Sequence, residues 1–261
     1  MKKKILTGLL CVGMVLSLAG CGEKKSASDM ENIKSKGTLV VGITDFAPMD
    51  YKDEAGNWIG FDADLAKEFA KSLGVEASFV EIDWDNKIME LDGGTVDCIW
   101  NGMTLTSEVT NAMSCSTAYC NNSQVVIVKS DVASSYQTTD SLKELNFAVE
   151  TGSAGAEQAA AYGLSYTEVS NQANALMEVE AGTCDAAIID SLMAAAMVGE
   201  GTSYTDLTYT VGLNSEEYGV GFRKGSDLTS EFNKFFDEKC ADGTVEDIAT
   251  TYGVQAALIT R

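Results

Sequence analysis

The chain has 261 residues, of which 39 are acidic and 18 basic, so its formal net charge is −21 at pH 7. A field of that sign repels nucleic acid and anionic lipid headgroups, which makes both poor partners. Histidine is absent, which excludes catalytic pairs of Ser or Cys with His and also His metal ligands. The 45% hydrophobic content suits a globular chain of one or two domains.

The N-terminus has the pattern of a bacterial lipoprotein export signal. Lysines at positions 2–4 precede an apolar run over 5–18, which is shorter than the roughly 20 residues that span a bilayer and suits a signal peptide. The Leu-Ala-Gly-Cys that ends in Cys21 resembles a lipobox, in which this cysteine receives a lipid; an ordinary signal peptide with a chance cysteine is the alternative. We expect residues 1–20 to be the signal peptide and residues 21–37 a lipidated, flexible tether.

The cysteines beyond this leader are Cys98, Cys115, Cys120, Cys184 and Cys240. No C-x-x-C pair occurs among them, which argues against a zinc ribbon or a thioredoxin-like site, and we expect neither metal nor cofactor. Cys98 and Cys184 lie in apolar, strand-like runs and are expected as small buried residues. Cys115 and Cys120 are close enough in sequence to form a short-loop disulfide, and the sequence leaves open whether they do.

Strand and helix patterns alternate from residue 38 onward. The run TLVVGIT over 38–44 predicts a buried strand, and a turn follows that contains Pro48, the one proline of the chain. Apolar residues recur at i, i+4 in FDADLAKEFAKSLG over 61–74, which predicts an amphipathic helix that ends at its glycine. The next predicted elements are a strand over 75–82, a helix over 85–94 and a strand over 95–100.

The same plan recurs in the second half of the chain. The predicted elements are strand 146–150, helix 151–163, strand 164–170, helix 173–182, strand 184–190 and helix 191–199. Two α/β lobes, each with a mostly parallel sheet, explain this repetition, and a single doubly wound domain is the alternative. Ligands of such sheets lie at the C-terminal ends of strands, so a cleft between two lobes would collect loops from both.

Several segments, in order along the chain, resemble the extracellular solute-binding proteins of family 3, which serve amino-acid ABC importers. They are GFDADLA at 60–66, DWDNKIMEL at 83–91, IWNGMTLT at 99–106 and DGTVEDIATTYG at 242–253. The resemblance implies the type II periplasmic-binding-protein fold, an α/β fold with two Rossmann-like lobes joined by a two-crossing hinge.

This resemblance also implies how the chain is divided. Residues 38–124 and 218–261 would form lobe 1, and residues 125–217 would form lobe 2. The hinge crossings would lie near 125–129 and 212–220.

The resemblance further implies a ligand pocket. Phe46 takes the place of an aromatic that packs on the ligand side chain, although a core phenylalanine under a turn is the alternative. Asn101 and Gly102 lie at a strand end whose groups meet the ligand's α-ammonium. Thr104 takes the place of a hydroxyl that meets its carboxylate. Ser153, at a helix start, can offer a hydroxyl and N–H groups to an anion.

Asp190 takes the place of the lobe 2 aspartate that pairs with the α-ammonium. A carboxylate at a buried strand end costs several kcal/mol of desolvation unless it is paired, and a cationic ligand would supply the partner. The alternative is a structural N-cap for the helix that follows. Together with Asp45, Glu216 and Glu217 near the expected cleft, Asp190 favours a polar or positively charged ligand.

The chain departs from the family pattern at two positions that hold the ligand's carboxylate. Val109 stands where the family has an arginine that clamps it, and Ala154 stands where a second hydroxyl is usual. No Lys or Arg occurs between Lys87 and Lys129. The carboxylate would then be held by neutral donors or by a distant lysine, or the ligand would be an amine without a free α-carboxylate.

We therefore expect a monomeric receptor, lipid-anchored outside the bacterial cell membrane. It would bind an amino acid or a related small polar amine and deliver it to an ABC permease. The alternatives are a surface sensor or adaptor of the same fold, and a cleft enzyme such as a dehydratase. Without histidine no triad can activate Ser153, and we expect no catalytic residue.

Overall fold

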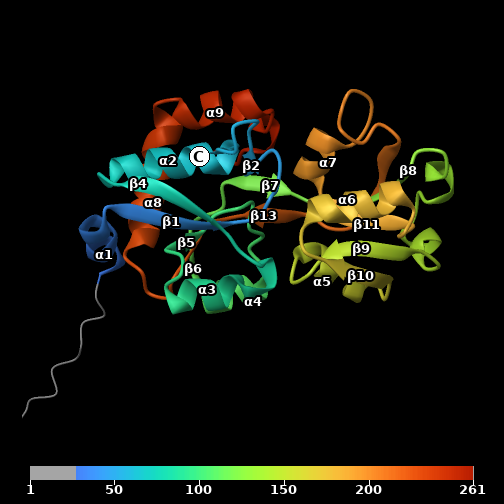
Figure 1. Cartoon of the computed structure of the whole chain (residues 1–261), viewed down its shortest axis with the longest axis horizontal. Helices are drawn as coiled ribbons and strands as arrows, with labels where there is room; N and C mark the ends of the chain where they lie inside the picture. Colours follow the sequence, from blue (N-terminus) through green and yellow to red (C-terminus); the bar gives the residue numbers. More distant parts are fainter. Residues whose placement is uncertain (1–27, 261) are drawn as a thin grey trace, which may run out of the picture.

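The two predicted βαβ repeats fold into two lobes that lie side by side in the computed structural model, which describes residues 28–260 (Figure 1). The predicted signal peptide and the lipidation site at Cys21 lie outside the described residues. Within the described part, no helix combines the length and the apolar character that crossing a membrane requires.

The sheet of the first lobe is built around the buried strand β1 (Thr38–Ile43). β4 (Glu76–Glu81) and β5 (Cys98–Ile99) pair with it in parallel on its two sides. β14 (Gly221–Phe222) and β6 (Ser114–Cys115) extend the sheet beyond β5 with antiparallel pairing. The sheet is therefore mixed rather than mostly parallel, because the chain returns from the second lobe to insert β14.

Helices cover both faces of this sheet (Figure 1). On one face lie α2 (Phe61–Ser72), α8 (Leu228–Ala241) and α9 (Thr244–Tyr252), and on the other lie α3 (Lys87–Gly93) and α4 (Ser107–Ala112). The apolar face predicted for α2 is buried, and Phe69 packs against Phe232 with ring centroids 5.4 Å apart. Trp100 at the end of β5 meets the same ring edge-on at 4.9 Å. This aromatic core holds the strand ends of the lobe in place.

Part of the segment 21–37, which we expected to be a flexible tether, is helical in the structure. Its last residues form α1 (Asp29–Lys36), which Ser28 caps at the N-terminus and Gly37 at the C-terminus. Ile33 is fully buried against the lobe, and Asp29 forms an ion pair with Arg223 at 2.8 Å. These contacts make the helix part of the first lobe.

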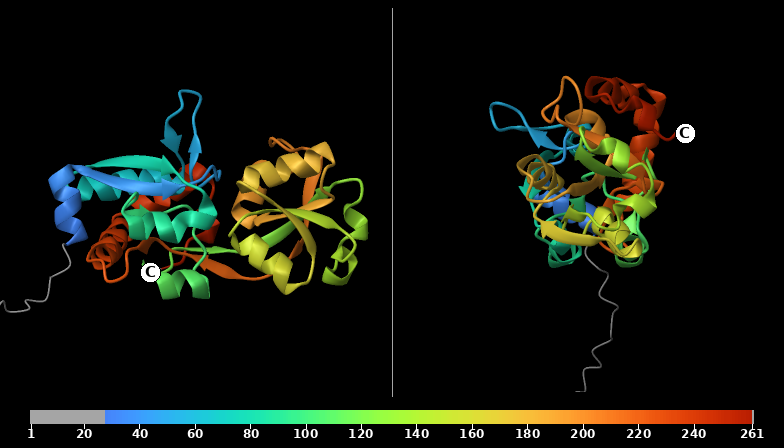
Figure 2. Two further views of the ribbon diagram at one scale, coloured as in Figure 1. Left: turned by 60° about the horizontal axis from the view of Figure 1, so that its bottom comes forward. Right: turned by 90° about the vertical axis from the view of Figure 1, so that its right-hand side faces the viewer.

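The second sheet has the strand order β10-β9-β11-β8-β12. Its strands are β10 (Ser165–Val169), β9 (Asn146–Glu150), β11 (Ala186–Asp190), β8 (Gln124–Lys129) and β12 (Leu207–Gly212). The first three are parallel, whereas β8 is antiparallel to both its neighbours. Figure 2 shows α5 (Ala154–Ala161) and α6 (Gln172–Ala181) on opposite sides of this sheet, and α7 (Ser191–Met197) follows β11.

A two-stranded antiparallel ribbon joins the lobes. It consists of β7 (Cys120–Asn122) and β13 (Glu216–Tyr218), with Glu216 opposite Asn122. The crossing expected near 125–129 lies instead at this ribbon, because those residues form β8 inside the second sheet. The second expected crossing, 212–220, contains β13. The lobe limits stay predictions.

The remaining elements are short. They are β2 (Tyr51–Lys52) and β3 (Trp58–Ile59), which pair with each other, and the 3-10 turns η1 (Trp84–Asn86), η2 (Ala133–Ser135), η3 (Thr139–Leu142) and η4 (Gln255–Ala257). Cys115 and Cys120 are both free thiols, so the disulfide that the sequence left open is not formed here. Within residues 28–260 no cluster of Cys, Asp and Glu has the composition of a metal site.

Gly60, which precedes α2 in the GFDADLA motif, has a φ of 128°. A Cβ at this position would lie 2.1 Å from the carbonyl oxygen of Met49. We expect Gly60→Ala to lower the free energy of unfolding by about 2–4 kcal/mol, because it combines backbone strain with a clash against backbone. Thermal unfolding should then occur about 4–16 °C lower.

Gly56 is the matched control, since its φ is 84° and a Cβ there meets nothing within 4 Å. Gly56→Ala should cost only the strain of a left-handed alanine, about 1 kcal/mol. Equal melting temperatures for the two variants would show that the contact with Met49 does not restrict this position.

Candidate functional site

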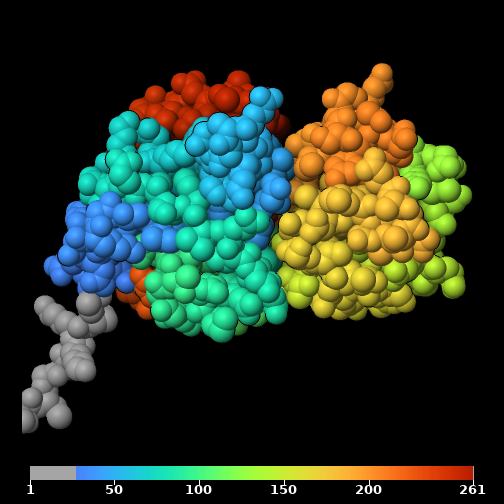
Figure 3. All heavy atoms as spheres, viewed as in Figure 1, coloured from blue at the N-terminus to red at the C-terminus, as the bar shows by residue number. Residues whose placement is uncertain are grey.

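A pocket lies where the two lobes meet, along the seam seen between them in Figure 3. Its seventeen lining residues leave a cavity of about 30 Å³, within a total empty space of about 450 Å³ that includes the part open to solvent. All eight positions singled out from the sequence line it: Phe46, Asn101, Gly102, Thr104, Val109, Ser153, Ala154 and Asp190. The structure therefore brings these positions together, while their roles toward a ligand stay predictions.

Gly102 shapes the lobe 1 wall and is held from behind by Asp62 of the GFDADLA motif. The Gly102 N–H donates to Asp62 Oδ2 at 2.6 Å, and the Tyr119 hydroxyl donates to the same oxygen at 2.7 Å. A Cβ on Gly102 would lie 2.4 Å from the ring of Phe46, which also lines the pocket. Burial raises the pKa of Asp62 to about 7. The motif thus positions the strand end from the core of the lobe.

The polar side chains of Asn101 and Thr104 are already engaged within the protein. Asn101 exchanges two hydrogen bonds of 2.9 Å with Thr44, one to the backbone N–H and one to the hydroxyl. The Thr104 hydroxyl donates to Glu216 Oε1 at 2.9 Å. Thr104 therefore gives its proton to the protein, so its hydroxyl can meet a ligand only as an acceptor.

Asp190 ends β11 at the pocket and is 5% exposed. Its Oδ1 accepts hydrogen bonds from Tyr218 at 2.8 Å, from Gln124 at 2.9 Å and from Asn122, and its Oδ2 accepts one from Gln172. It stands at the N-cap position of α7, but its side chain makes no capping bond. Burial, and after it the charge of Glu216, raise the pKa of Asp190 to about 7. The Asp190 carboxylate is therefore held by these four side-chain hydrogen bonds and not by capping α7.

The N-terminus of α5 supplies the facing wall of lobe 2. Ser153 caps the helix, and its Oγ accepts from the Ala156 N–H at 3.1 Å. Its hydroxyl proton stays available to a neighbour. The N–H groups of Ala154 and Gly155 belong to the first turn and have no acceptor within the helix. This end of α5 suits a negatively charged group.

Val109, at the position of the missing arginine, is 2% exposed. It packs in an apolar cluster that also contains Trp84, Met103 and Met113. Its backbone N–H donates to Thr106 at the start of α4. The position thus contributes apolar surface to the pocket wall and no charge.

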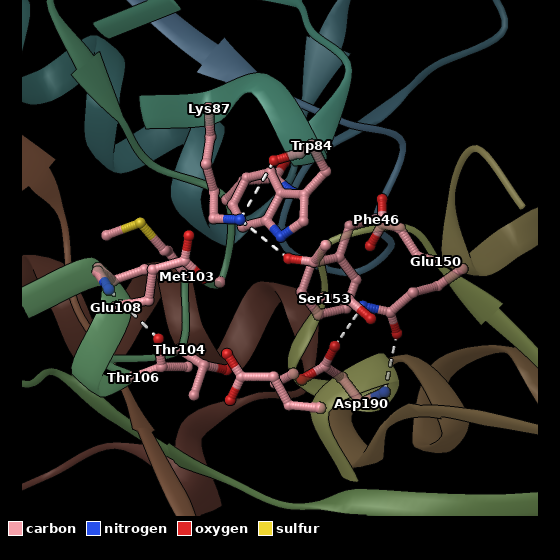
Figure 4. Close-up of a pocket in the computed structure, with 17 residues that line it drawn as sticks. Phe46, Trp84, Lys87, Met103, Thr104, Thr106, Glu108, Glu150, Ser153 and Asp190 are labelled. Carbon is pink, nitrogen blue, oxygen red and sulfur yellow. Dashed lines mark hydrogen bonds between the residues drawn. The ribbon is translucent and has the colours of Figure 1, made fainter. Parts of the chain in front are cut away.

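Lys87 was not predicted as a site residue from the sequence, but it lines the pocket and is 5% exposed. Its Nζ donates to the Trp84 carbonyl at 3.2 Å and, across the lobes, to the Gly152 carbonyl at 2.9 Å (Figure 4). Burial lowers its pKa. Among the lining residues it is the one cation, whereas Arg223 forms ion pairs with Asp29 and Asp97 elsewhere in lobe 1. The signal was the DWDNKIMEL segment, where Trp84 and Lys87 are three residues apart.

Two further lining residues were also missed: Trp84, and Glu150 at the end of β9. Glu150 is 3% exposed, and burial together with the charge of Asp190 raises its pKa to about 8. Of the other acids expected near the cleft, Glu216 reaches the pocket through Thr104. Asp45 and Glu217 do not line it.

Comparison with known proteins places these features in a family. The family model for bacterial extracellular solute-binding proteins, family 3, matches residues 39–255. The arginine-binding extracellular protein ArtP of Bacillus subtilis (strain 168) is 31% identical over 255 residues, covering 94% of this chain and 96% of ArtP.

Solved structures agree with this assignment. A substrate-binding protein of an ABC uptake transporter from Streptococcus pneumoniae, with bound histidine, superposes with a TM-score of 0.80 at 27% identity, covering 88% of this chain and 98% of its own. An ancestral amino-acid-binding protein, a precursor of cyclohexadienyl dehydratase, has a TM-score of 0.79 at 31% identity, covering 86% and 99%. The predicted type II periplasmic-binding-protein fold is confirmed, and the chain belongs to the bacterial extracellular solute-binding proteins of family 3.

Proposed function

We propose that the chain is the substrate-binding component of an ABC importer and that it takes an amino acid, or a related small polar amine, into the pocket between its lobes. The observation that carries this proposal is the buried carboxylate of Asp190 at that pocket. Relatives named for arginine and for histidine, one of them from an ABC uptake transporter, support it.

Asp190 is suited to bind the ligand's α-ammonium. Its donors come from β7 and β13 of the hinge ribbon and from lobe 2, so the carboxylate is held firmly where the lobes meet. Within residues 28–260, three donors reach Oδ1, whereas Gln172 alone reaches Oδ2. Oδ2 therefore has a lone pair for an ammonium, and the new charge pair would offset the desolvation of Asp190.

Lys87 supplies a cation for the ligand's carboxylate in place of the arginine lost at Val109. Two of its three Nζ protons are used by the carbonyls of Trp84 and Gly152, which leaves one for a ligand. Gly152 directly precedes Ser153, so Nζ lies beside the N-terminus of α5. A carboxylate there would meet the ammonium, the Ser153 hydroxyl and first-turn N–H groups together. The sequence left open whether neutral donors or a distant lysine hold the carboxylate, or whether the ligand has none. The present proposal is the distant lysine.

The bond from Lys87 to Gly152 also joins lobe 1 to lobe 2. A ligand held by Asp190 from one lobe and by Lys87 from the other would draw the lobes together, as in other hinge-closing receptors. The closed form would then dock on a membrane permease. Export by the signal peptide and anchoring through Cys21 would place the receptor outside the cell membrane.

A thermal-shift screen over amino acids, short peptides and polyamines tests this function. A ligand that binds only the native state at a hundred times its Kd should add about 2.7 kcal/mol to the free energy of unfolding, which corresponds to about 5–11 °C in Tm. We expect such shifts from amino acids. Shifts from polyamines alone would select the amine alternative within this proposal. Shifts from peptides alone, or from no compound, would contradict it.

The same compounds separate the alternatives. Isothermal titration run beside a turnover assay tests for a dehydratase, and product formation would replace the receptor function. Stimulation of the ATPase activity of a reconstituted permease by the loaded receptor supports import. A receptor that binds an amino acid but acts only on a sensor protein would be the adaptor instead.

A further inference from the structure

Glu150 has a buried carboxylate oxygen without a partner. The residue ends β9, lines the pocket and is 3% exposed. Its Oε1 makes no hydrogen bond to any other described residue. Buried polar atoms are nearly always paired, because an unpaired one loses its hydration without replacement. Figure 4 shows Glu150 on the same side of the pocket as Asp190 and across from Lys87.

The cation in the pocket does not satisfy this oxygen. Lys87 directs its Nζ to the carbonyls of Trp84 and Gly152 and makes no ion pair with Glu150 within the described residues. The nearby charge of Asp190 makes an ionised Glu150 less favourable still. Lys87 and a hydrogen bond from Gln172 act on the Glu150 carboxyl in the opposite direction. Oε1 itself still has no partner among the described residues, so a group that pairs with it would come from a ligand.

The buried charges of the pocket indicate the charge that a partner of Glu150 should have. Lys87, Glu150 and Asp190 are the buried charged residues that line it, while Glu108 and Glu157 are exposed. An α-amino acid has one ammonium, for Asp190, and one carboxylate, for Lys87. Glu150, whose pKa burial raises to about 8, is then left without a counter-charge and stays protonated in a site that closure removes from water. A ligand with a second cation balances all three buried charges.

We propose that Glu150 pairs with a positively charged side chain of the ligand, so that the pocket selects cationic amino acids over neutral ones of the same shape. This rests on the proposed function. Trp84 and Phe46 line the same space and would pack against the apolar stem of such a side chain. The chemical class is an α-amino acid with a distal ammonium or guanidinium group.

Matched ligand pairs test this assignment in the full-length protein. Arginine and citrulline differ in one side-chain charge at nearly constant shape, and lysine and 6-hydroxynorleucine form a second pair. Titration calorimetry should show at least a tenfold preference for the cationic member of one pair. In Glu150→Gln, which keeps the shape and removes the charge, that preference should fall by at least tenfold.

Glu168→Gln is the control, because Glu168 is an exposed acid on the neighbouring strand β10. It removes the same charge from the same lobe and should leave the preference unchanged within twofold. Melting temperatures of both variants verify that each is folded.

Three results would overturn the assignment. In one, the wild type binds neutral amino acids as tightly as cationic ones. In another, Glu150→Gln keeps the full preference for the cationic member. In the third, Glu168→Gln loses the preference as much as Glu150→Gln does, which would indicate a general field of the acidic lobe. Each of these results is compatible with an amino-acid receptor. The proposed function itself would be contradicted if no amino acid and no related amine bound the wild type.

Discussion

Asp190→Ala is expected to weaken binding of the ligand by at least tenfold. The substitution removes the counter-charge of the α-ammonium, and truncating one partner of a buried, hydrogen-bonded charge pair costs about 2–5 kcal/mol. It also removes the acceptor of the donors of Gln172 and Tyr218, whereas Gln124 still donates to Glu216. Titration calorimetry with the amino acid found by the thermal-shift screen measures the effect.

Asp190→Asn separates charge from structure. Asparagine keeps an acceptor oxygen for part of this network, so the variant should fold nearly as well as the wild type, and its loss of affinity should come mainly from the missing charge. Unchanged affinity in Asp190→Asn would contradict the ammonium-pairing role, whatever Asp190→Ala does.

The pH dependence of binding provides an independent check on the same carboxylate. Burial raises the pKa of Asp190 to about 7 and that of Glu150 to about 8. The charge of Glu216 raises the first further, and for Glu150 the charges of Asp190 and Asp83 raise the pKa while Lys87 lowers it. A bound cation favours the ionised forms, so binding releases protons and affinity rises as the pH increases from 6 to 8. Asp190→Asn should remove part of this slope.

Lys87→Met is the second change for which we expect a large effect. Methionine fills a similar volume but cannot pair with a carboxylate, so the affinity for the amino acid should fall by about tenfold or more. The loss of the bond to Gly152 weakens closure around every ligand equally. The corresponding amine without its carboxylate, such as agmatine compared with arginine, therefore serves as the internal control and should lose much less.

An arginine at position 109, where the family pattern has one, should restore part of the affinity that Lys87→Met loses. In Lys87→Met combined with Val109→Arg, part of the affinity for the amino acid should return, although arginine at the buried Val109 position costs stability. Equal losses for the amino acid and its amine in Lys87→Met would mean that Lys87 acts only by joining the lobes. Val109→Arg alone should bring little gain, because Lys87 already occupies the site.

The alternation of strands and helices was predictable because each element carries a complete local signal. α2, for example, has apolar residues at helical spacing and a glycine after its last turn. The pocket positions followed from the resemblance to the family 3 solute-binding proteins. α1 was missed because it buries little beyond Ile33 and Met30, although Ser28 and Glu31 have the spacing of a helix N-cap signal.

The roles of the charged side chains in the pocket were harder to predict, because they depend on contacts between the two lobes. Lys87 follows Trp84 by one helical turn, yet only the approach of Gly152 from the other lobe shows where its ammonium lies. Glu150 ends an apolar strand in the same way as Asp190, and nothing local shows that one oxygen is unpaired. Thr104 has the expected place, but its proton goes to Glu216, 112 residues away in the chain.

The ribbon of β7 and β13 should control how long a ligand stays bound. Asn122 in β7 and Tyr218 in β13 donate to the same oxygen of Asp190. Because the ribbon joins the lobes, we expect their separation to twist it and to loosen these bonds before the ligand leaves. We expect substitutions in the ribbon to act on the dissociation rate more than on the association rate. The residence time of the ligand, and with it the turnover of each receptor at its permease, would then be adjustable without touching a residue of the pocket.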